Sequence, residues 1–341
     1  MSESGKMLLQ VKNVSKRFTS KGVCVRAVSD VSFDISEGET VGIVGESGCG
    51  KTTLGRCIVR AIPASEGEVL YTDSQERTRD FLKLDKKQMK EVRKEIQMIF
   101  QDPYSSLDPR MTVIDIIAEP LKANYPDMPR EEREKRVIDI ARRVGLNTTY
   151  LKRYPHAFSG GQRQRIGIAR ALVLQPRLIV CDEAVSALDV SIQAQIINLL
   201  RDLQKEMHLT YIFISHDLSV VEHISDKVGV MYLGRLVEFG KTEELFSRPL
   251  HPYTEALLSA VPVADPDYSM DRIPLQGEIP NPANPPSGCY FHERCRYCKQ
   301  KCIDEWPELR VVNGRQVACH FAEEMQLRGF DYEEDALKKG E

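Results

Sequence analysis

Hydrophobic positions along this chain follow two periods, one typical of strands and one typical of helices. Residues 7–14 and 25–36 are predicted to be strands, and 25–36 shows the two-residue alternation of a half-buried strand. Residues 40–44 and 96–100 are short apolar runs typical of buried strands. The run at 40–44 leads through a glycine-rich turn into a helix with its apolar residues on one face. The N-terminal part is therefore predicted to contain strands followed by a strand–turn–helix unit.

The second half of the chain also alternates between strand and helix. The runs RLIVCD and TYIFIS are predicted strands, separated by a long helix with Ile196, Leu200 and Leu203 in register. Residues 227–232 and 235–239 are predicted to form a hairpin. Because strands separated by helices form parallel sheets with covered faces, we expect an α/β fold with a mainly parallel sheet and antiparallel N-terminal strands.

Two segments depart from this alternation. Residues 112–158 are helical in pattern and are expected to form an insertion lobe on the sheet. Prolines cluster between Pro262 and Pro286, which predicts a linker or extended segment over 261–288. A cysteine-rich C-terminal extension, 289–341, follows a main domain that spans 1–260.

Composition narrows the class of protein. Of 341 residues, 42% are hydrophobic and 28% charged, as in soluble globular proteins. The 47 Lys and Arg residues against 50 Asp and Glu give a net charge of −3, which argues against nucleic-acid binding through a basic surface. No apolar run approaches the roughly 20 residues that cross a bilayer, and the start MSESGKMLLQ lacks the apolar core of a secretory signal. We therefore expect a cytosolic protein with reduced cysteines, whose membrane role comes through a partner.

The sharpest motif is a phosphate-binding loop of the form G-x-x-x-x-G-K-[ST]. Its glycines allow backbone N–H groups to surround a phosphate, and the following helix contributes the positive end of its dipole. Lys51 is expected to reach the β- and γ-phosphates, and the Thr52 hydroxyl to bind Mg²⁺. The predicted ATP-binding residues are Gly45, Glu46, Ser47, Gly48, Cys49, Gly50, Lys51, Thr52 and Thr53.

An acidic pair at the end of the strand LIVCD complements this loop. Asp182 is expected to hold Mg²⁺, directly or through water, and Glu183 to act as general base on the attacking water. Together the two motifs predict a Mg²⁺-dependent nucleoside triphosphatase.

Four further motifs follow in a fixed order. The run FSGGQRQR opens a helix with a serine cap and two glycines, which makes a second anion site. Because one nucleotide does not need two such sites in one subunit, we expect this one to face a second subunit. The other motifs are Gln101 after a strand, Ser186-Ala187-Leu188-Asp189 after the acidic pair, and His216 at the end of TYIFIS.

This set resembles the ATP-binding cassette (ABC) ATPases over about residues 7–250, through GESGCGKTT, QDPYSSLDP, FSGGQRQRI, LIVCDE, SALD and ISHD. The resemblance implies that Gln101 joins Thr52 and Asp182 at Mg²⁺, and that His216 holds the γ-phosphate and attacking water. It implies that Ser159, Gly160, Gly161 and Gln162 clamp the ATP of the opposite subunit, next to the D-loop formed by residues 186–189. Phe18 is similar to the aromatic residue that stacks on adenine; a core aromatic at a strand end is the alternative.

Two positions differ from the usual family pattern. Ala184 follows the catalytic glutamate where the family usually has proline, and Phe158 begins the signature in place of the commoner leucine. Neither change removes a predicted catalytic group or a backbone donor of the signature.

Within the family, the chain is similar to the second ATPase of oligopeptide and dipeptide importers. YSSLDPRMTV, RYPHAFSGGQRQRI, SHDLSVVEHISDKV and HPYTEALLSAVP carry this similarity, which extends through the C-terminal tail. It implies a second ATPase of the DppD/OppD type, two membrane-spanning permeases and an external peptide-binding protein. The chain itself is then expected at the cytoplasmic face of the membrane.

Five cysteines in the extension suggest a metal site. They follow the pattern C-x5-C-x2-C-x3-C-x16-C, namely Cys289, Cys295, Cys298, Cys302 and Cys319. Thiolates in a small segment suit Zn²⁺ or an iron–sulfur cluster, with plain reduced thiols as the alternative. By resemblance, all but Cys298 match four cysteines that can carry a [4Fe–4S] cluster. His292 and His320 are rival ligands.

Three other functions are alternatives to a peptide importer. ABC ATPases of DNA repair or ribosomes usually have long coiled-coil insertions or two cassettes in one chain, and neither pattern is present. A non-hydrolysing subunit would lack the glutamate, the histidine or a signature glycine. A nickel or oligosaccharide importer would use a similar ATPase, since other chains select the cargo.

Overall fold

The structure is a computed structural model that describes residues 5–20, 22–102, 104–261 and 272–330. Parts of the predicted linker and of the predicted extension, 262–271 and 331–341, lie outside the described residues.

The N-terminal strands form a four-stranded antiparallel sheet with the order β2-β1-β4-β5. Its strands are β1 (Met7–Ser20), β2 (Val23–Ser36), β4 (Glu66–Thr72) and β5 (Thr78–Asp80). The strand predicted at 7–14 is confirmed but continues to Ser20. Residues 17–20 are exposed, so they show no hydrophobic alternation from which the extra length could have been predicted.

The central sheet has the order β11-β12-β10-β9-β3-β8-β7-β6. It is parallel from β9 to β6, as predicted, and the predicted hairpin is its antiparallel pair β9–β10. Its strands are β3 (Thr40–Val44), β6 (Ile96–Ile99), β7 (Leu178–Asp182), β8 (Thr210–Ile214), β9 (Lys227–Tyr232), β10 (Arg235–Lys241), β11 (Arg310–Val312) and β12 (Arg315–Val317). Every residue of β3, β7 and β8 is buried, which explains their continuous apolar runs.

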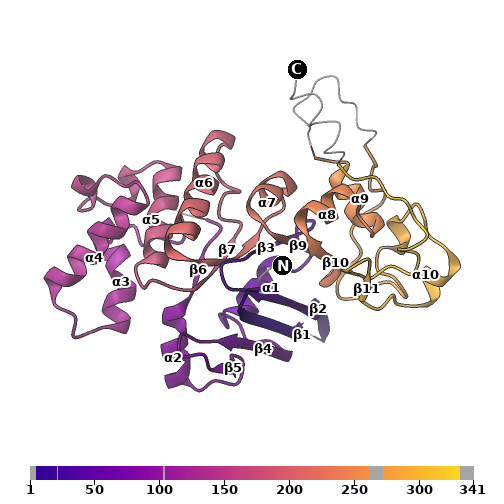
Figure 1. Ribbon diagram of the computed structural model, residues 1–341, viewed down its shortest axis with the longest axis horizontal. Coiled ribbons are helices and arrows are strands. Elements are labelled where there is room, and N and C mark those ends of the chain that lie inside the picture. The colour runs from indigo at the N-terminus through magenta and orange to yellow at the C-terminus, as the bar shows by residue number, and fades with distance from the viewer. Residues whose placement is uncertain (1–4, 21, 103, 262–271, 331–341) are drawn as a thin grey trace.

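Helices pack against this sheet and form a lobe at one end of the molecule. They are α1 (Lys51–Ile58), α2 (Lys86–Glu95), α3 (Val113–Asn124), α4 (Arg130–Arg143), α5 (Gly160–Leu172), α6 (Val190–Met207), α7 (Leu218–Ile224), α8 (Thr242–Ser247), α9 (Pro252–Leu258) and α10 (Gln300–Asp304). The lobe contains α3, α4 and α5, and the yellow C-terminal segment lies at the opposite end (Figure 1). Ile117, Val137 and Ile166 are fully buried in a core cluster that the lobe shares with the sheet.

The parallel order positions the predicted motifs. Since β3, β7 and β8 are parallel neighbours, their carboxyl ends meet at one edge of the sheet. The phosphate-binding loop follows β3, the acidic pair ends β7, and His216 follows β8. Three motifs that are spread between Gly45 and His216 in the sequence therefore converge.

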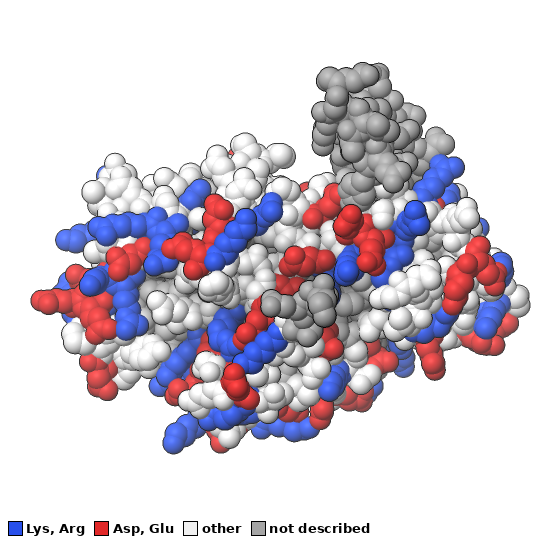
Figure 2. Space-filling view, in the orientation of Figure 1, with Lys and Arg blue, Asp and Glu red and all other residues white. Residues whose placement is uncertain are grey.

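Surface and membrane properties follow the composition. Figure 2 shows positive and negative side chains interspersed over the visible face, without a continuous basic stripe. Within the described ranges, no helix combines the length and apolar character needed to cross a membrane.

Candidate active site

A cavity of about 480 Å³ lies at the carboxyl edge of the central sheet. Many of its lining residues belong to the motifs predicted from the sequence, namely Ser47, Gly48, Gly50, Lys51, Thr52, Thr53, Gln101, Glu183 and His216. The lining residues that the motifs do not predict are Val25, Arg26, Ala27, Leu233, Gly234 and Pro282. These come from β2, from the β9–β10 turn and from the proline-rich segment, where no local motif marks a ligand site.

The phosphate-binding loop is held in a conformation that two glycines permit. Gly45 has φ 148°, and a Cβ atom there would lie 2.2 Å from the carbonyl oxygen of Met231. Gly50 has φ 103°, and its Cβ would lie 2.1 Å from the carbonyl oxygen of Ala27. Backbone atoms thus exclude any side chain at these positions. The ammonium group of Lys51 is buried and donates hydrogen bonds to the carbonyl oxygens of Gly45 (2.7 Å) and Glu46 (3.0 Å).

Thr52 and Asp182 form a group of oxygen atoms beside this loop. The Thr52 hydroxyl donates a 2.7 Å hydrogen bond to Oδ1 of Asp182. Oδ2 of Asp182 is buried and has no hydrogen-bond partner among the described residues. Burial raises the pKa of Asp182, and the hydrogen bond from Thr52 opposes this. A buried, unpartnered carboxylate oxygen next to a hydroxyl fits the oxygen ligands that Mg²⁺ prefers.

Glu183, Gln101 and His216 meet over the cavity. Gln101 Nε2 donates a 2.7 Å hydrogen bond to Oε2 of Glu183, and His216 Nδ1 lies 3.4 Å from the same oxygen. The Glu183 backbone is in the left-handed region, with φ 47°, and its N–H donates to the carbonyl oxygen of Ile214. A non-glycine residue in this region is strained, as is frequent at functional sites. The sequence motif did not reveal this conformation.

The signature lies outside the cavity. Ser159 caps α5 with a capping box: Ser159 Oγ accepts from the backbone N–H of Gln162 (3.4 Å), and Gln162 Oε1 accepts from the N–H of Ser159 (3.0 Å). The serine cap predicted from the sequence is confirmed. None of residues 159–162 lines the cavity, so the structure does not bring them to the phosphate-binding loop of the same chain.

The D-loop and Phe18 also lie near the cavity without lining it. The Ser186 hydroxyl donates to the carbonyl oxygen of Glu183 (3.0 Å), and a Leu188 methyl group lies 3.5 Å from where a Cβ of Gly160 would be. Phe18 is 44% exposed and pairs across the strands with Val25, which does line the cavity. Its exposure excludes the alternative of a core aromatic in the described fold.

The C-terminal cysteines lie close together without forming a ready metal site. Burial raises the pKa of Cys289 and of Cys295 to about 12, and the nearby thiols of Cys302 and Cys319 add to both shifts. Cys298 is exposed. His292 and His320 each contact a backbone carbonyl oxygen, those of Cys289 and Glu305. In the part of the chain that the structure describes, no three His, Cys, Asp or Glu side chains are arranged to hold a metal ion.

Comparison with known proteins agrees with this geometry. Residues 28–186 match the model of the ABC transporter family, and residues 237–302 match that of the oligopeptide/dipeptide transporter C-terminal region. A dimeric ATP-binding cassette solved in a post-hydrolysis state with ADP and Pi superposes with a TM-score of 0.62 at 30% identity. The superposed region covers 69% of this chain and 99% of the chain of that cassette.

Full-length relatives extend the match across the chain. The oligopeptide transport ATP-binding protein AppF of Bacillus subtilis is 52% identical over 92% of this chain and 97% of its own length. The di/tripeptide transport ATP-binding protein DppF of Pseudomonas aeruginosa is 50% identical over 88% of this chain and 91% of its own length. With its phosphate-binding loop, acidic pair and signature helix in the arrangement described, the chain belongs to the ABC transporter family, as an ATPase subunit with the oligopeptide/dipeptide type of C-terminal region.

Proposed function

We propose that this protein hydrolyses ATP to power the import of dipeptides or oligopeptides across the cytoplasmic membrane. The observation that carries the proposal is the contact of Glu183 with Gln101 and His216 over a cavity that also contains Lys51 and Thr52. The peptide cargo is supported by the names of relatives about 50% identical to this chain. No described feature favours nickel or an oligosaccharide over a peptide.

Each group of cavity residues has a separate role in phosphoryl transfer. Lys51 and the backbone N–H groups of residues 45–53 bind the β- and γ-phosphates, and Phe18 stacks on the adenine from the exposed end of β1. The Glu183 carboxylate accepts a proton from the attacking water. His216 and Gln101 orient that carboxylate and contact the γ-phosphate.

Thr52, Asp182 and Gln101 are the residues that would hold Mg²⁺. Asp182 Oδ2 is the buried oxygen still available for a cation, and the Thr52 hydroxyl is adjacent to the same carboxylate. When bound, Mg²⁺ neutralises charge that develops on the phosphate oxygens.

Residues 159–162 act on a nucleotide held by another cassette. They expose the N-terminus of α5 away from their own cavity, and a backbone N–H cluster at a helix N-terminus binds phosphate. ATP is then enclosed between two cassettes, with residues 186–189 at the junction. ATP must bind this closed dimer more tightly than the open one to drive the transition.

We also infer the partners and the division of the chain. A second cassette of the DppD/OppD type, two permeases and an external binding protein complete the transporter, and this chain is peripheral on the cytoplasmic side. Residues 1–260 act as the ATPase domain, in which the helical lobe at 112–158 contacts a permease. Residues 261–288 connect that domain to the cysteine-rich extension at 289–341.

The cysteine-rich extension is proposed to bind a metal centre through Cys289, Cys295, Cys302 and Cys319. Mutual proximity supports the proposal: the Cys289 N–H donates to the Cys302 carbonyl oxygen at 2.8 Å, and the thiols of Cys295, Cys302 and Cys319 all contribute to the raised pKa of Cys289. A [4Fe–4S] cluster is the first candidate and Zn²⁺ the second. Protein purified without oxygen is expected to contain iron and acid-labile sulfide, which Cys302→Ser should lower and Cys24→Ser should not. Protein free of both iron and zinc would refute the metal centre.

The function is tested with Glu183→Gln in the assembled transporter. The variant should bind ATP while hydrolysing it at least about 100-fold more slowly, because the general base is lost. Peptide uptake by cells should fall with it. Glu76→Gln, which changes an exposed carboxylate that pairs with Lys6 and does not line the cavity, is the matched control. Full turnover by Glu183→Gln would refute the catalytic assignment.

The cargo is tested separately. Hydrolysis stimulated by a nickel or oligosaccharide cargo, and not by peptides, would refute the peptide cargo.

A further inference from the structure

Glu46, within the phosphate-binding loop, is held from three directions. Its backbone N–H donates to the hydroxyl of Tyr253 (2.9 Å), and its carbonyl oxygen accepts from Lys51 (3.0 Å). Its carboxylate accepts two hydrogen bonds from Arg294, from Nη1 to Oε2 at 2.7 Å and from Nη2 to Oε1 at 3.0 Å. Glu46 thus links the phosphate-binding lysine to a residue 248 positions away.

Arg294 belongs to the cysteine-rich segment, residues 289–330. It ends the short turn His292–Arg294 and directly precedes Cys295. Its side chain is only 5% exposed, and Nη1 also lies 3.4 Å from the Tyr232 hydroxyl. The hydrogen bonds to Glu46 raise the pKa of Arg294 above its usual range. A buried bidentate arginine–carboxylate pair is a strong and directional contact.

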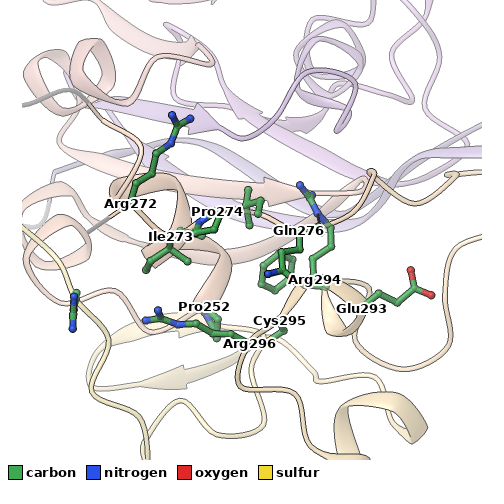
Figure 3. Close-up of a pocket in the computed structure, with 13 residues that line it drawn as sticks. Pro252, Arg272, Ile273, Pro274, Gln276, Glu293, Arg294, Cys295 and Arg296 are labelled. Atoms are coloured by element: carbon green, nitrogen blue, oxygen red, sulfur yellow. Dashed lines mark hydrogen bonds between the residues drawn. The ribbon is translucent and has the colours of Figure 1, made fainter. Parts of the chain in front are cut away.

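Aromatic packing of Phe291 holds the backbone next to Arg294 in place. The ring of Phe291 contacts both Tyr232 and Tyr253, with each pair of centroids 5.3 Å apart. Tyr253 in turn holds the Glu46 N–H. Figure 3 shows Arg294 and Arg296 leaving the cysteine-rich segment in different directions, on the border of a cavity of about 370 Å³. Arg294 points toward Glu46, and Arg296 pairs with Glu255 on α9.

The charge of Glu46 makes this contact relevant to nucleotide binding. Glu46 precedes Ser47 and Gly48, which line the ATP cavity. A carboxylate at this position repels an incoming triphosphate, and Arg294 compensates its charge. The contact also fixes the orientation of a residue whose carbonyl oxygen binds Lys51.

We propose that Arg294 is a positioning residue for ATP: the cysteine-rich segment reaches into the ATPase domain, neutralises Glu46 and holds the phosphate-binding loop in its binding conformation. The proposal rests on the ATP site of the proposed function. It assigns to that site a residue from a segment outside the nucleotide-binding motifs. The cysteine-rich segment is thereby a structural part of the ATP site.

The test uses the full-length chain for ATP titration and the assembled transporter for kinetics. Arg294→Gln should raise the Kd and the KM for ATP about tenfold while kcat stays within about twofold, because the hydrolytic groups are untouched. Glu46→Gln/Arg294→Gln should recover most of the affinity, since the unpaired charge is removed. Arg294→Lys keeps the charge without the bidentate geometry. Its ATP affinity should therefore lie between that of Arg294→Gln and that of the double variant.

Arg296→Gln is the matched control. It breaks another arginine–carboxylate pair of the same segment, with Glu255, which makes no contact with the phosphate-binding loop among the described interactions. Equal losses of ATP affinity in the two arginine variants would show general loosening of the segment and overturn the proposal, as would unchanged KM in Arg294→Gln. Lys51→Ala, made with Arg294 unchanged, tests the proposed function separately from the role of Arg294. ATP binding that survives this change would contradict the proposed function itself.

Discussion

At the scale of single residues, Glu238 on β10 combines complete burial with a carboxylate. It accepts hydrogen bonds from the backbone N–H groups of Leu250 (2.9 Å) and His251 (3.0 Å), and Arg315 Nη1 lies 3.4 Å away. Burial raises the pKa of Glu238 to about 7, and these partners oppose the shift. The folded protein therefore holds a proton on Glu238 at pH values where the unfolded chain has released it.

This shift predicts a pH dependence of stability with a defined sign. The contribution of Glu238 to the free energy of unfolding is largest at pH values below its ordinary pKa of 4.5. This contribution is lost as the pH rises through about 7. Between pH 5 and pH 8, the wild type should lose on the order of 2–3 kcal/mol of unfolding free energy relative to Glu238→Gln. Denaturant unfolding of both proteins at the two pH values measures this difference. Glu244→Gln on the exposed face of α8 should show no such trend, and a constant wild-type to Glu238→Gln difference would contradict the raised pKa.

The same scale shows how far the sequence predicts the site. Lys51, Thr52 and Asp182 belong to short motifs, and the sequence alone predicts that these residues come together, as the hydrogen bond from Thr52 to Asp182 shows. Arg26 and Pro282 line the cavity because distant segments meet there, and the Arg26 N–H donates to the Pro282 carbonyl oxygen at 3.3 Å. No period or motif encodes such a meeting.

At the scale of elements, α5 is the helix whose N-terminus is proposed to face a neighbouring subunit. A Cβ on Gly160 would be no closer than 3.5 Å to its neighbours, and nothing lies within 4 Å of one on Gly167, two turns further along the helix. Both positions therefore accept a side chain within the chain itself.

These two glycines make a matched pair of variants. Gly160→Asp should lower ATP hydrolysis by the assembled transporter at least about tenfold, because its carboxylate would face the phosphates bound by the opposite cassette. ATP affinity of the isolated chain should change less than twofold. Gly167→Asp adds the same charge to the same helix and should leave both quantities near wild type. Equal rates for the two variants would contradict the proposed contact across subunits.

The helices and strands also differ in how well the sequence predicts them. The strands β3, β7 and β8 are buried over their whole length and mostly apolar, and α6 has a clear buried face, so their prediction is confirmed. The strands β11 and β12 have three residues each and were not predicted. Buried Arg315 in β12 is stabilised by Glu238 and by backbone carbonyl oxygens of α8 and its C-cap, contacts that hydrophobic periodicity does not register.

At the scale of the whole molecule, the central sheet connects the nucleotide cavity with the C-terminal segment. The phosphate-binding loop follows β3, two strands from β10, and β10 pairs with β12. The α/β class and the parallel order could be predicted because strand–helix alternation limits the possible topologies. The return of the C-terminal segment to this sheet could not be predicted, since its pairing depends on distant contacts, as between Glu238 and Val317, which are 79 residues apart in the sequence.

The pairing of β12 with β10 has a consequence for shortened forms of the protein. Glu238 pairs with Val317, and Phe239 with Gln316, so the outer side of β10 is covered by the hairpin of β11 and β12, the last strands among the described residues. A chain cut before residue 310 would leave seven-residue β10 as a bare sheet margin with unmatched amide and carbonyl groups. Self-association through that margin is the expected fate of such a fragment, and tags or fusions are better tolerated beyond the final hairpin than in place of it.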